Sequence, residues 1–267
     1  MLFTADYHLH SQFSFDSEEK IENICEKAIK EGLCEIAVTD HADIYTNRKY
    51  DDDIDIKAQQ RALLAAKKKY AGKLSVICGI EFGQPQMNEN EAKRFYEENE
   101  FDLIIGSIHN LKNDSDIYYY NFDKLDCDKV YEEYLTELTV LAEKFDFDVM
   151  GHITYPLRYM YMYNKKTVDI TKYTDEIKRL FGLLIEKGRG IEINTSGLRQ
   201  KIGKTFPDIQ TVELYKKCGG EIITVGSDAH EAKDVGSGIK DGYEMLRRCG
   251  FKYVTSYEKR KAKFNRI

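Results

Sequence analysis

The sequence predicts an α/β fold, a distorted (β/α)7 TIM-like barrel. Short apolar runs rich in β-branched residues alternate with amphipathic stretches at a spacing of roughly 30–40 residues, which is typical of βα units and a mainly parallel sheet. Polar residues follow nearly every run. In a barrel all strand ends converge on one mouth, whereas an open sheet collects its functional groups at one switch point. The spread of polar residues over many strands therefore favours a barrel.

Seven apolar runs are predicted to be strands, and an eighth short strand is possible. Their apolar residues are nearly continuous rather than alternating, which is typical of strands buried on both faces. The predicted strands are residues 3–7, 35–39, 74–80, 101–105, 146–150, 190–194 and 221–225, with residues 252–257 as the possible eighth.

Amphipathic stretches between these runs predict helices. In residues 18–31 apolar side chains recur at helical spacing, and Gly32 ends the pattern. Similar stretches cover residues 56–70, 88–98, 128–144, 171–187, 209–217 and 239–248. The acidic run 51–55 is expected to form a solvated loop before a helix, and the basic residues 258–267 a surface terminus. No linker or repeat interrupts the chain, so a single domain over residues 1–267 is expected.

Composition excludes several classes of function. The chain has 267 residues, 40 Lys and Arg against 46 Asp and Glu, and a formal charge of -6. This balance argues against a protein that grips long nucleic acid through a basic face. No run approaches the roughly 18 apolar residues of a membrane span, and the first residues lack the layout of a secretory signal. We therefore expect a cytoplasmic protein without a membrane partner, and the sequence leaves its oligomeric state open.

The placement of the histidines predicts a metal site. All six lie at or just after the end of an apolar run, beside small residues. A single histidine there is more often structural, but six together are not explained that way. In an extended segment His8 and His10 point to the same side, so both can bind one ion. The candidate ligands are His8, His10, Asp16, His41, Glu81, His109, His152, Asp228 and His230.

The number of candidate ligands predicts more than one ion. Nine groups exceed the three or four that one catalytic zinc takes, so two or three ions are expected. Glu81 could bridge a pair at the roughly 3.5–4 Å spacing of two-metal sites. Arg158 and Arg199 each follow a predicted strand, and a guanidinium beside a metal-rich mouth suits a phosphate dianion. Either arginine could instead pair with an acid. The nearby tyrosines could wall a pocket for a flat organic group or serve as packing residues.

The ordered motifs HLHSQFSFDS, VTDH, GIE, GSIH, GH and GSDAH resemble those of the polymerase-and-histidinol-phosphatase (PHP) superfamily. The resemblance covers nearly the whole chain. Within the superfamily, GIEFGQP, GHITYPLRY and INTSGLR are similar to the monofunctional histidinol-phosphate phosphatases. The resemblance implies hydrolysis of L-histidinol phosphate to L-histidinol and phosphate in histidine biosynthesis.

The resemblance also implies three divalent ions of manganese, iron or zinc. The first would be held by His8, His10, Glu81 and Asp228, and the second by Glu81, His109 and His152. His41 and His230 would hold the third, together with Asp16 where many superfamily members have a histidine. Arg158 and Arg199 would bind the phosphate.

Our mechanistic hypothesis is direct attack on phosphorus by a hydroxide that bridges two ions, with Asp228 or His230 delivering a proton to the leaving group. Two alternatives stay open. One is a phosphoesterase for nucleotides or other small phosphate esters, and the other is a non-catalytic metal-binding barrel.

Overall fold

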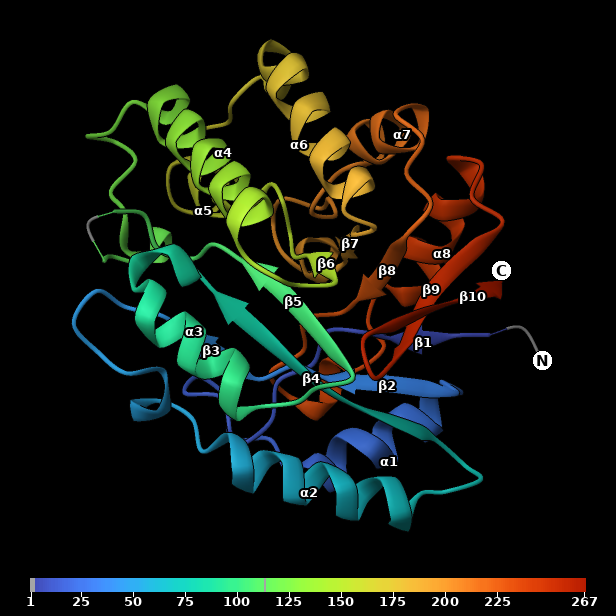
Figure 1. Cartoon of the computed structure of the whole chain (residues 1–267). Helices are drawn as coiled ribbons and strands as arrows, with labels where there is room; N and C mark the ends of the chain where they lie inside the picture. The colour runs from blue at the N-terminus through green and yellow to red at the C-terminus, as the bar shows by residue number, and fades with distance from the viewer. Residues whose placement is uncertain (1–2, 113) are drawn as a thin grey trace.

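The computed structural model describes residues 3–112 and 114–267, and it contains the predicted barrel (Figure 1). The strands follow the ladder order β1 (Ala5–Asp6), β2 (Glu35–Val38), β4 (Ser75–Gly83), β5 (Leu103–Ser107), β6 (Val149–Met150), β7 (Gly190–Asn194) and β8 (Ile223–Gly226). Every neighbouring pair is parallel. The ring is nearly closed, because the Tyr7 amide donates to the carbonyl of Val225 at 2.9 Å. The predicted fold class is confirmed.

One strand of the barrel is interrupted. β2 pairs with Ser75–Cys78 of β4, and a further short strand, β3 (His41–Asp43), pairs with Glu81–Gly83 of the same strand. Between β2 and β3 the Asp40 carboxylate accepts from the Ser11 amide and from the Gln59 side chain. β3 was not predicted, because it lies beyond the apolar run among polar residues. His41, the first residue of β3, lies at the mouth of the barrel.

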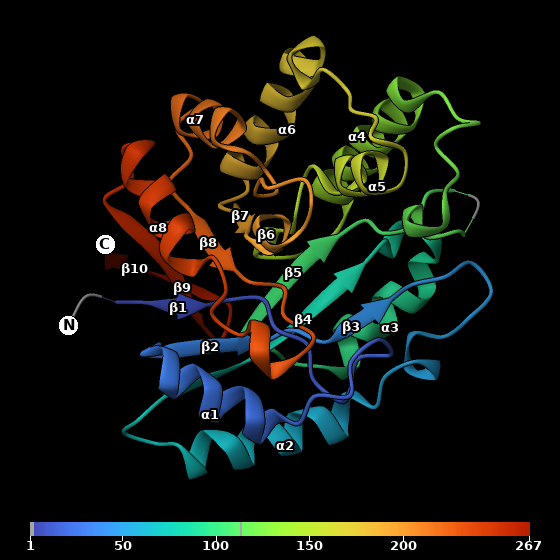
Figure 2. The same cartoon turned by 180° about the vertical axis from the view of Figure 1, so that it is seen from behind.

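The seven predicted helices all form around the outside of the barrel (Figures 1 and 2). Asp55 caps α2 by accepting from the Ala58 amide, so the end of the acidic run starts a helix. The helices are α1 (Ile21–Glu31), α2 (Ile56–Lys69), α3 (Glu89–Glu98), α4 (Cys127–Lys144), α6 (Thr174–Glu186), α7 (Ile209–Lys217) and α8 (Ile239–Arg248). Short 3-10 helices lie at Tyr50–Asp52, Pro85–Met87, Ile117–Tyr119, Ile170–Tyr173, Ser196–Arg199 and Ala232–Asp234.

One helix was not predicted. α5 (Tyr155–Asn164) follows β6 directly, with Pro156 in its first turn. Its residues, YPLRYMYMYN, show no clear polar face, and Tyr155, Arg158 and Met160 are all buried. Because helical periodicity is weak in such a stretch, the sequence signal was missed. The helix matters for function because it presents Arg158 to the mouth of the barrel.

The C-terminal prediction was wrong in part. The possible eighth strand exists as β9 (Tyr253–Glu258), but it pairs antiparallel with β10 (Lys261–Arg266) in a separate two-stranded sheet. The basic terminus is therefore a hairpin strand, although most of its side chains are exposed. Arg260 in the turn fixes the hairpin through its Nε, which donates to Asp148 at 2.5 Å. The lysines and arginine of β10 kept the sequence from showing an apolar run, so this strand was not predicted.

Two clusters of buried apolar residues form the core. A large apolar cluster fills the space between strands and helices. A smaller cluster lies inside the barrel and includes Ala5, Ile77, Leu103, Val149 and Tyr257 of β9. Beyond this cluster the interior becomes polar towards the carboxyl ends of the strands. Among the described residues, no helix is both long enough and apolar enough to cross a bilayer.

Candidate metal centre

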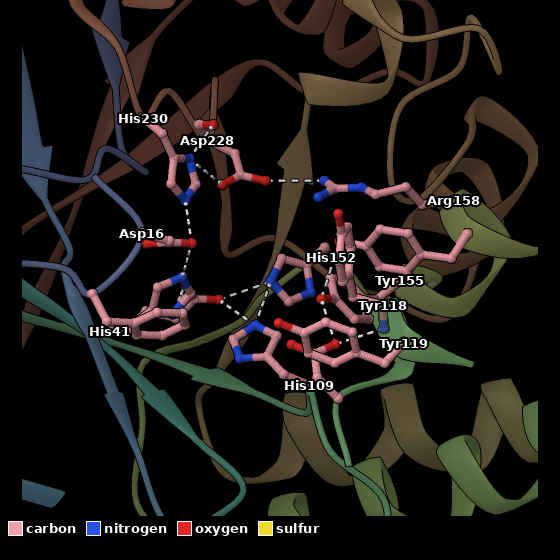
Figure 3. Close-up of a pocket in the computed structure, with 14 residues that line it drawn as sticks. Asp16, His41, His109, Tyr118, Tyr119, His152, Tyr155, Arg158, Asp228 and His230 are labelled. Atoms are coloured by element: carbon pink, nitrogen blue, oxygen red, sulfur yellow. Dashed lines mark hydrogen bonds and ion pairs between the residues drawn. The ribbon is translucent and has the colours of Figure 1, made fainter. Parts of the chain in front are cut away.

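The structure brings all nine predicted ligands together at the carboxyl ends of the strands. Figure 3 labels six of them: Asp16, His41, His109, His152, Asp228 and His230. His8 and His10 follow β1, Glu81 lies within β4, and the remaining ligands come from the ends of other strands or from the loop after β1. His8, His10, Glu81, His109, His152 and Asp228 are buried, as is His41, whereas Asp16 and His230 are partly exposed. Residues separated by up to 222 positions in the sequence thus meet because parallel strands end at one mouth.

Glu81 is the centre of the cluster. Its Oε1 lies 2.7 Å from His152 Nε2 and 3.1 Å from His109 Nε2. Its Oε2 lies 3.1 Å from His8 Nε2 and 3.1 Å from His41 Nδ1. One carboxylate therefore faces histidines on both of its oxygens, which is the arrangement needed to bridge two ions.

Asp228 completes the group around His8 and His10. Its Oδ1 lies 3.5 Å from His10 Nε2 and 3.9 Å from His8 Nε2, while His10 Nε2 is 3.6 Å from Glu81 Oε2. His10 Nε2 is buried and has no hydrogen-bond partner among the described residues. A buried imidazole nitrogen that faces two carboxylates without a hydrogen bond fits a metal ligand.

Asp16, His41 and His230 form the outer part of the cluster. Asp16 Oδ2 lies 3.0 Å from His230 Nε2 and 3.5 Å from His41 Nε2. Possible ligand atoms of these three residues and His10 all lie within 4.8 Å of one another. The same holds for two further groups, His8 with His10 and Glu81, and His41 with Glu81 and His109. Three overlapping groups of N and O donors fit a polynuclear site.

The electrostatics show that this cluster requires positive charge. Burial alone would raise the pKa of Glu81, but His8, His41 and His109 hold it well below its usual range. Burial alone would lower the pKa of His41, but Glu81 and Asp16 raise it to about 9. Burial and the neighbouring His230 and His41 lower the pKa of His10 to about 3. The carboxylates are thus stabilised by cations beside them, which protonated imidazoles or divalent ions can supply.

Two buried acids that the sequence reasoning missed position the ligands. Glu192 of β7 places Oε1 2.7 Å from His8 Nδ1, and its Oε2 accepts from the His152 amide at 3.0 Å. Asp43 of β3 places Oδ2 3.2 Å from His109 Nδ1. A carboxylate on the second ring nitrogen orients a ligating histidine. A charged residue inside the apolar run GIEIN was the signal that could have revealed Glu192.

Small residues make room for this arrangement, as predicted. A Cβ added to Gly226 would lie 2.4 Å from His8 Cβ and 2.5 Å from Glu192 Oε1. One added to Gly151 would lie 2.8 Å from Ser107 Oγ, whose hydroxyl donates to Glu81. Glycine at these two positions lets the strands approach the ligands closely.

Arg158 contacts the cluster of predicted ligands from within the cavity, whereas Arg199 contacts the backbone that carries Asp228. The Arg158 guanidinium is buried, donates to Asp228 Oδ2 at 2.9 Å and hydrogen-bonds Ser196, and it lines the cavity. Arg199 donates to the carbonyls of Ser227 and Asp228 at 2.5 and 2.7 Å and is not among the residues that line the cavity. It fixes the turn in which Asp228 adopts a left-handed φ of 54°. Phosphate binding by Arg199 stays a prediction.

A cavity of about 370 Å³ opens beside the cluster. Several of the predicted ligands form one wall, and Tyr118, Tyr119 and Tyr155 lie on the other side of His109 and His152 (Figure 3). Tyr159 and Phe15 add to the aromatic lining. Of the two roles left open for the tyrosines, the pocket wall is seen at Tyr118, Tyr119, Tyr155 and Tyr159, and the volume suits a small organic molecule.

Known proteins resemble this chain over most of its length. Residues 6–196 match the PHP domain family model. A probable histidinol-phosphatase of Thermotoga maritima is 28% identical over 93% of this chain and 94% of its own. The histidinol-phosphatase of Lactococcus lactis is 28% identical over 94% of this chain and 93% of its own.

A solved structure shares the fold. The histidinol phosphate phosphatase of Lactococcus lactis, complexed with zinc, L-histidinol and phosphate, superposes with a TM-score of 0.85 at 23% identity, covering 98% of this chain and 100% of that one. The family match spans more than half of the sequence and contains most of the histidine cluster. This chain belongs to the PHP domain family.

Proposed function

We propose that this protein hydrolyses L-histidinol phosphate to L-histidinol and phosphate, as a metal-dependent phosphatase. The observation that carries the proposal is the cluster around Glu81, which lines the same cavity as Arg158. The names of the relatives supply the substrate, since they are histidinol-phosphatases aligned over more than nine tenths of this chain. The Lactococcus lactis relative was crystallised with zinc, L-histidinol and phosphate.

Three ions of zinc, manganese or iron fit the three overlapping groups of ligands. When bound, such ions acidify water and neutralise the charge of a transferring phosphoryl group. His8, His10, Glu81 and Asp228 would hold the first ion, and His109 and His152 would share Glu81 with the second. Asp16, His41 and His230 would hold the third, although His41 Nδ1 also lies 3.1 Å from Glu81 Oε2.

Arg158 would bind the phosphate through its guanidinium. Asp228 and Ser196 hold the group in place, and burial strengthens its attraction for a dianion. Its own ion pair with Asp228 restrains it before substrate arrives, so little side-chain entropy is lost on binding. Arg199 would act on phosphate indirectly, through the turn of Ser227 and Asp228.

The proton for the leaving alkoxide would come from His230 or Asp228. His230 is the more accessible of the two, because its side chain is 30% exposed at the rim of the cavity and that of Asp228 is 8% exposed. His10 and Arg158 hold the pKa of Asp228 well below its usual range despite burial, so its carboxyl is ionised at neutral pH and carries no proton to donate. We also propose that the reaction takes place in the cytoplasm, because a charged phosphate ester made there does not cross a membrane unaided.

Phosphate release from a panel of esters tests the proposal. The metal-loaded protein is assayed with L-histidinol phosphate, a nucleoside 5′-monophosphate and a bis-aryl phosphodiester. We expect kcat/KM for histidinol phosphate to exceed the others by more than about 100-fold, which equals roughly 2.7 kcal/mol of discrimination. Faster hydrolysis of the nucleotide would support the nucleotide phosphoesterase instead. No turnover with a full complement of metal would support the non-catalytic barrel.

A further inference from the structure

Asp116 is a carboxylate in the cavity without a cationic partner. Four acids line the cavity, and three of them contact histidine or arginine: Asp16, Glu81 and Asp228. The described residues include no histidine, lysine or arginine within ion-pairing distance, 4.0 Å, of the Asp116 carboxylate. Its hydrogen-bond donors are the Tyr118 amide at 2.7 Å and the Tyr155 hydroxyl at 3.3 Å, both of them neutral.

One oxygen of Asp116 is left for a ligand. Both of those donors contact Oδ1, and no described residue donates a hydrogen bond to Oδ2. Burial raises the pKa of Asp116, and the more distant charge of His109 reverses this only in part. A partly buried carboxylate of this kind is stabilised when a cation approaches its open oxygen.

Aromatic rings line the same cavity as Asp116. Tyr118 makes edge-to-face contacts with Tyr119 at 4.9 Å and Tyr159 at 5.4 Å between ring centroids. The Tyr118 and Tyr119 side chains remain 46% and 77% exposed, so their rings are open to a ligand. Tyrosine faces attract organic cations and pack against flat rings. Carboxylate and rings together suit an organic ammonium on an apolar body.

Asp116 lies on the side of the cavity where the alcohol half of a phosphate ester bound at Arg158 would lie. Tyr155 connects the two: its hydroxyl donates to Asp116, and its ring centroid lies 5.5 Å from the Arg158 guanidinium carbon. Its ring also lies 5.0 Å from that of His152. A phosphate ester held at Arg158 and the metal ligands would therefore place its alcohol half towards Asp116.

We propose that Asp116 is a specificity-determining residue that binds the ammonium group of an amino-alcohol phosphate, with Tyr118 and Tyr119 packing against the rest of the alcohol. The inference rests on the proposed function for the position of the phosphate. It extends that function by assigning recognition of the alcohol half to a carboxylate outside the metal cluster.

Asp116→Asn tests the charge without disturbing the local fold. Asp116 caps the short helix Ile117–Tyr119, and asparagine caps equally well through Oδ1. The change replaces the open Oδ2 by an amide nitrogen, which repels an ammonium. Asp126→Asn is the matched control, because Asp126 caps α4 in the same manner and does not line the cavity.

The assay compares four phosphate esters on the metal-loaded enzyme. L-histidinol phosphate and phenylalaninol phosphate carry the ammonium, whereas phenyl phosphate and a deaminated histidinol phosphate lack it. We expect Asp116→Asn to lower kcat/KM about 10- to 100-fold for the first two and less than about threefold for the others. Asp126→Asn should match the wild type on all four. Losses for deaminated histidinol phosphate that equal those for histidinol phosphate would show that Asp116 reads the imidazole or is merely structural, and would overturn the proposal.

Binding of the alcohol alone separates this inference from the proposed function. Calorimetry with free L-histidinol and the metal-loaded protein should show a Kd about 10- to 100-fold weaker for Asp116→Asn than for the wild type. Suppose that the wild type hydrolyses no phosphate ester but that Asp116→Asn binds L-histidinol about 10- to 100-fold more weakly than the wild type does. The proposed function then fails and the ammonium site stands. If the ester preference holds and Asp116→Asn has wild-type affinity, the ammonium site fails.

Discussion

Replacing Glu192 by glutamine tests how the metal centre is positioned. Glu192 is fully buried, and its two oxygens serve two close donors, His8 Nδ1 at 2.7 Å and the His152 amide at 3.0 Å. Its Oε2 also accepts from the Asn194 side chain at 3.4 Å. An ionised carboxylate can only accept, so it directs the His8 proton to Nδ1 and leaves Nε2 free to face Glu81. Glutamine has one acceptor oxygen, so one of the two donors loses its partner.

The size of the effect follows from those two hydrogen bonds. A buried hydrogen bond to a charged group contributes about 1.5–3 kcal/mol, and an outer partner of a ligating histidine contributes about 10- to 100-fold in metal affinity. These ranges agree, because a factor of 10 corresponds to about 1.4 kcal/mol. Asp16 and His230 lie in the outer group, so we expect the weakest loss of metal there and the strongest at His8.

Zinc affinity is measured by competition with a chromophoric chelator, and metal content by elemental analysis. Thr224→Val is the matched control, because Thr224 pairs with Glu192 in the ladder, is buried, and has a hydroxyl without a partner among the described residues. The control should bind zinc as the wild type does. Wild-type zinc affinity and stoichiometry in Glu192→Gln would refute the positioning role, since the loss of an acceptor would then have had no consequence at His8.

Three further predictions concern charge at the mouth of the barrel. Arg158→Ala should raise KM for phosphate esters at least tenfold while metal content is kept. Arg199→Ala should lower the melting temperature and kcat, because it loosens the turn at Asp228. A raised KM in Arg199→Ala together with a lowered melting temperature in Arg158→Ala would contradict this assignment. Glu81 and Asp16 outweigh burial and raise the pKa of His41 to about 9, so in metal-free protein its proton adds stability that is complete below about pH 6.5 and is lost as the pH rises towards 9. The same proton competes with metal, so zinc affinity should increase from pH 6.5 to 9, and a flat profile would exclude His41 as a ligand. Chelation should abolish activity, and Mn²⁺ or Zn²⁺ should restore it; full activity after complete removal of metal, checked by elemental analysis, would refute metal dependence.

The sequence predicted well which side chains gather at the mouth of the barrel, because of where they lie in the chain; their binding of metal stays a prediction. Each ligand histidine stands in a short polar motif that interrupts or ends an apolar run, so its chemistry contrasts with its neighbours. The barrel then requires those ends to meet. Convergence of His8, His109 and His152 on Glu81 therefore follows from topology once the strands are recognised.

The residues that support the ligands were harder to predict. Glu192 lies inside an apolar run, 184 positions from His8, and only the three-dimensional pairing of the strands shows that they meet. Asp43 belongs to a strand too short to give a periodic signal. Similar reasons hid α5, which has no clear polar face, and β10, whose lysines and arginines concealed a strand.

The two arginines show why equal sequence context does not give equal roles. Both follow a barrel strand, and each was predicted to bind phosphate. Arg158 sits on α5, which follows β6 after the short segment 151–154, and its side chain reaches back over the mouth to Asp228. Arg199 ends a 3-10 helix after β7 and donates instead to backbone carbonyls beside Asp228. Because Asp228 holds a left-handed backbone conformation that favours glycine, its turn needs such external bonds. Arg158 thus faces the cavity and Arg199 holds Asp228 in place, so substitutions of the two should separate binding from stability.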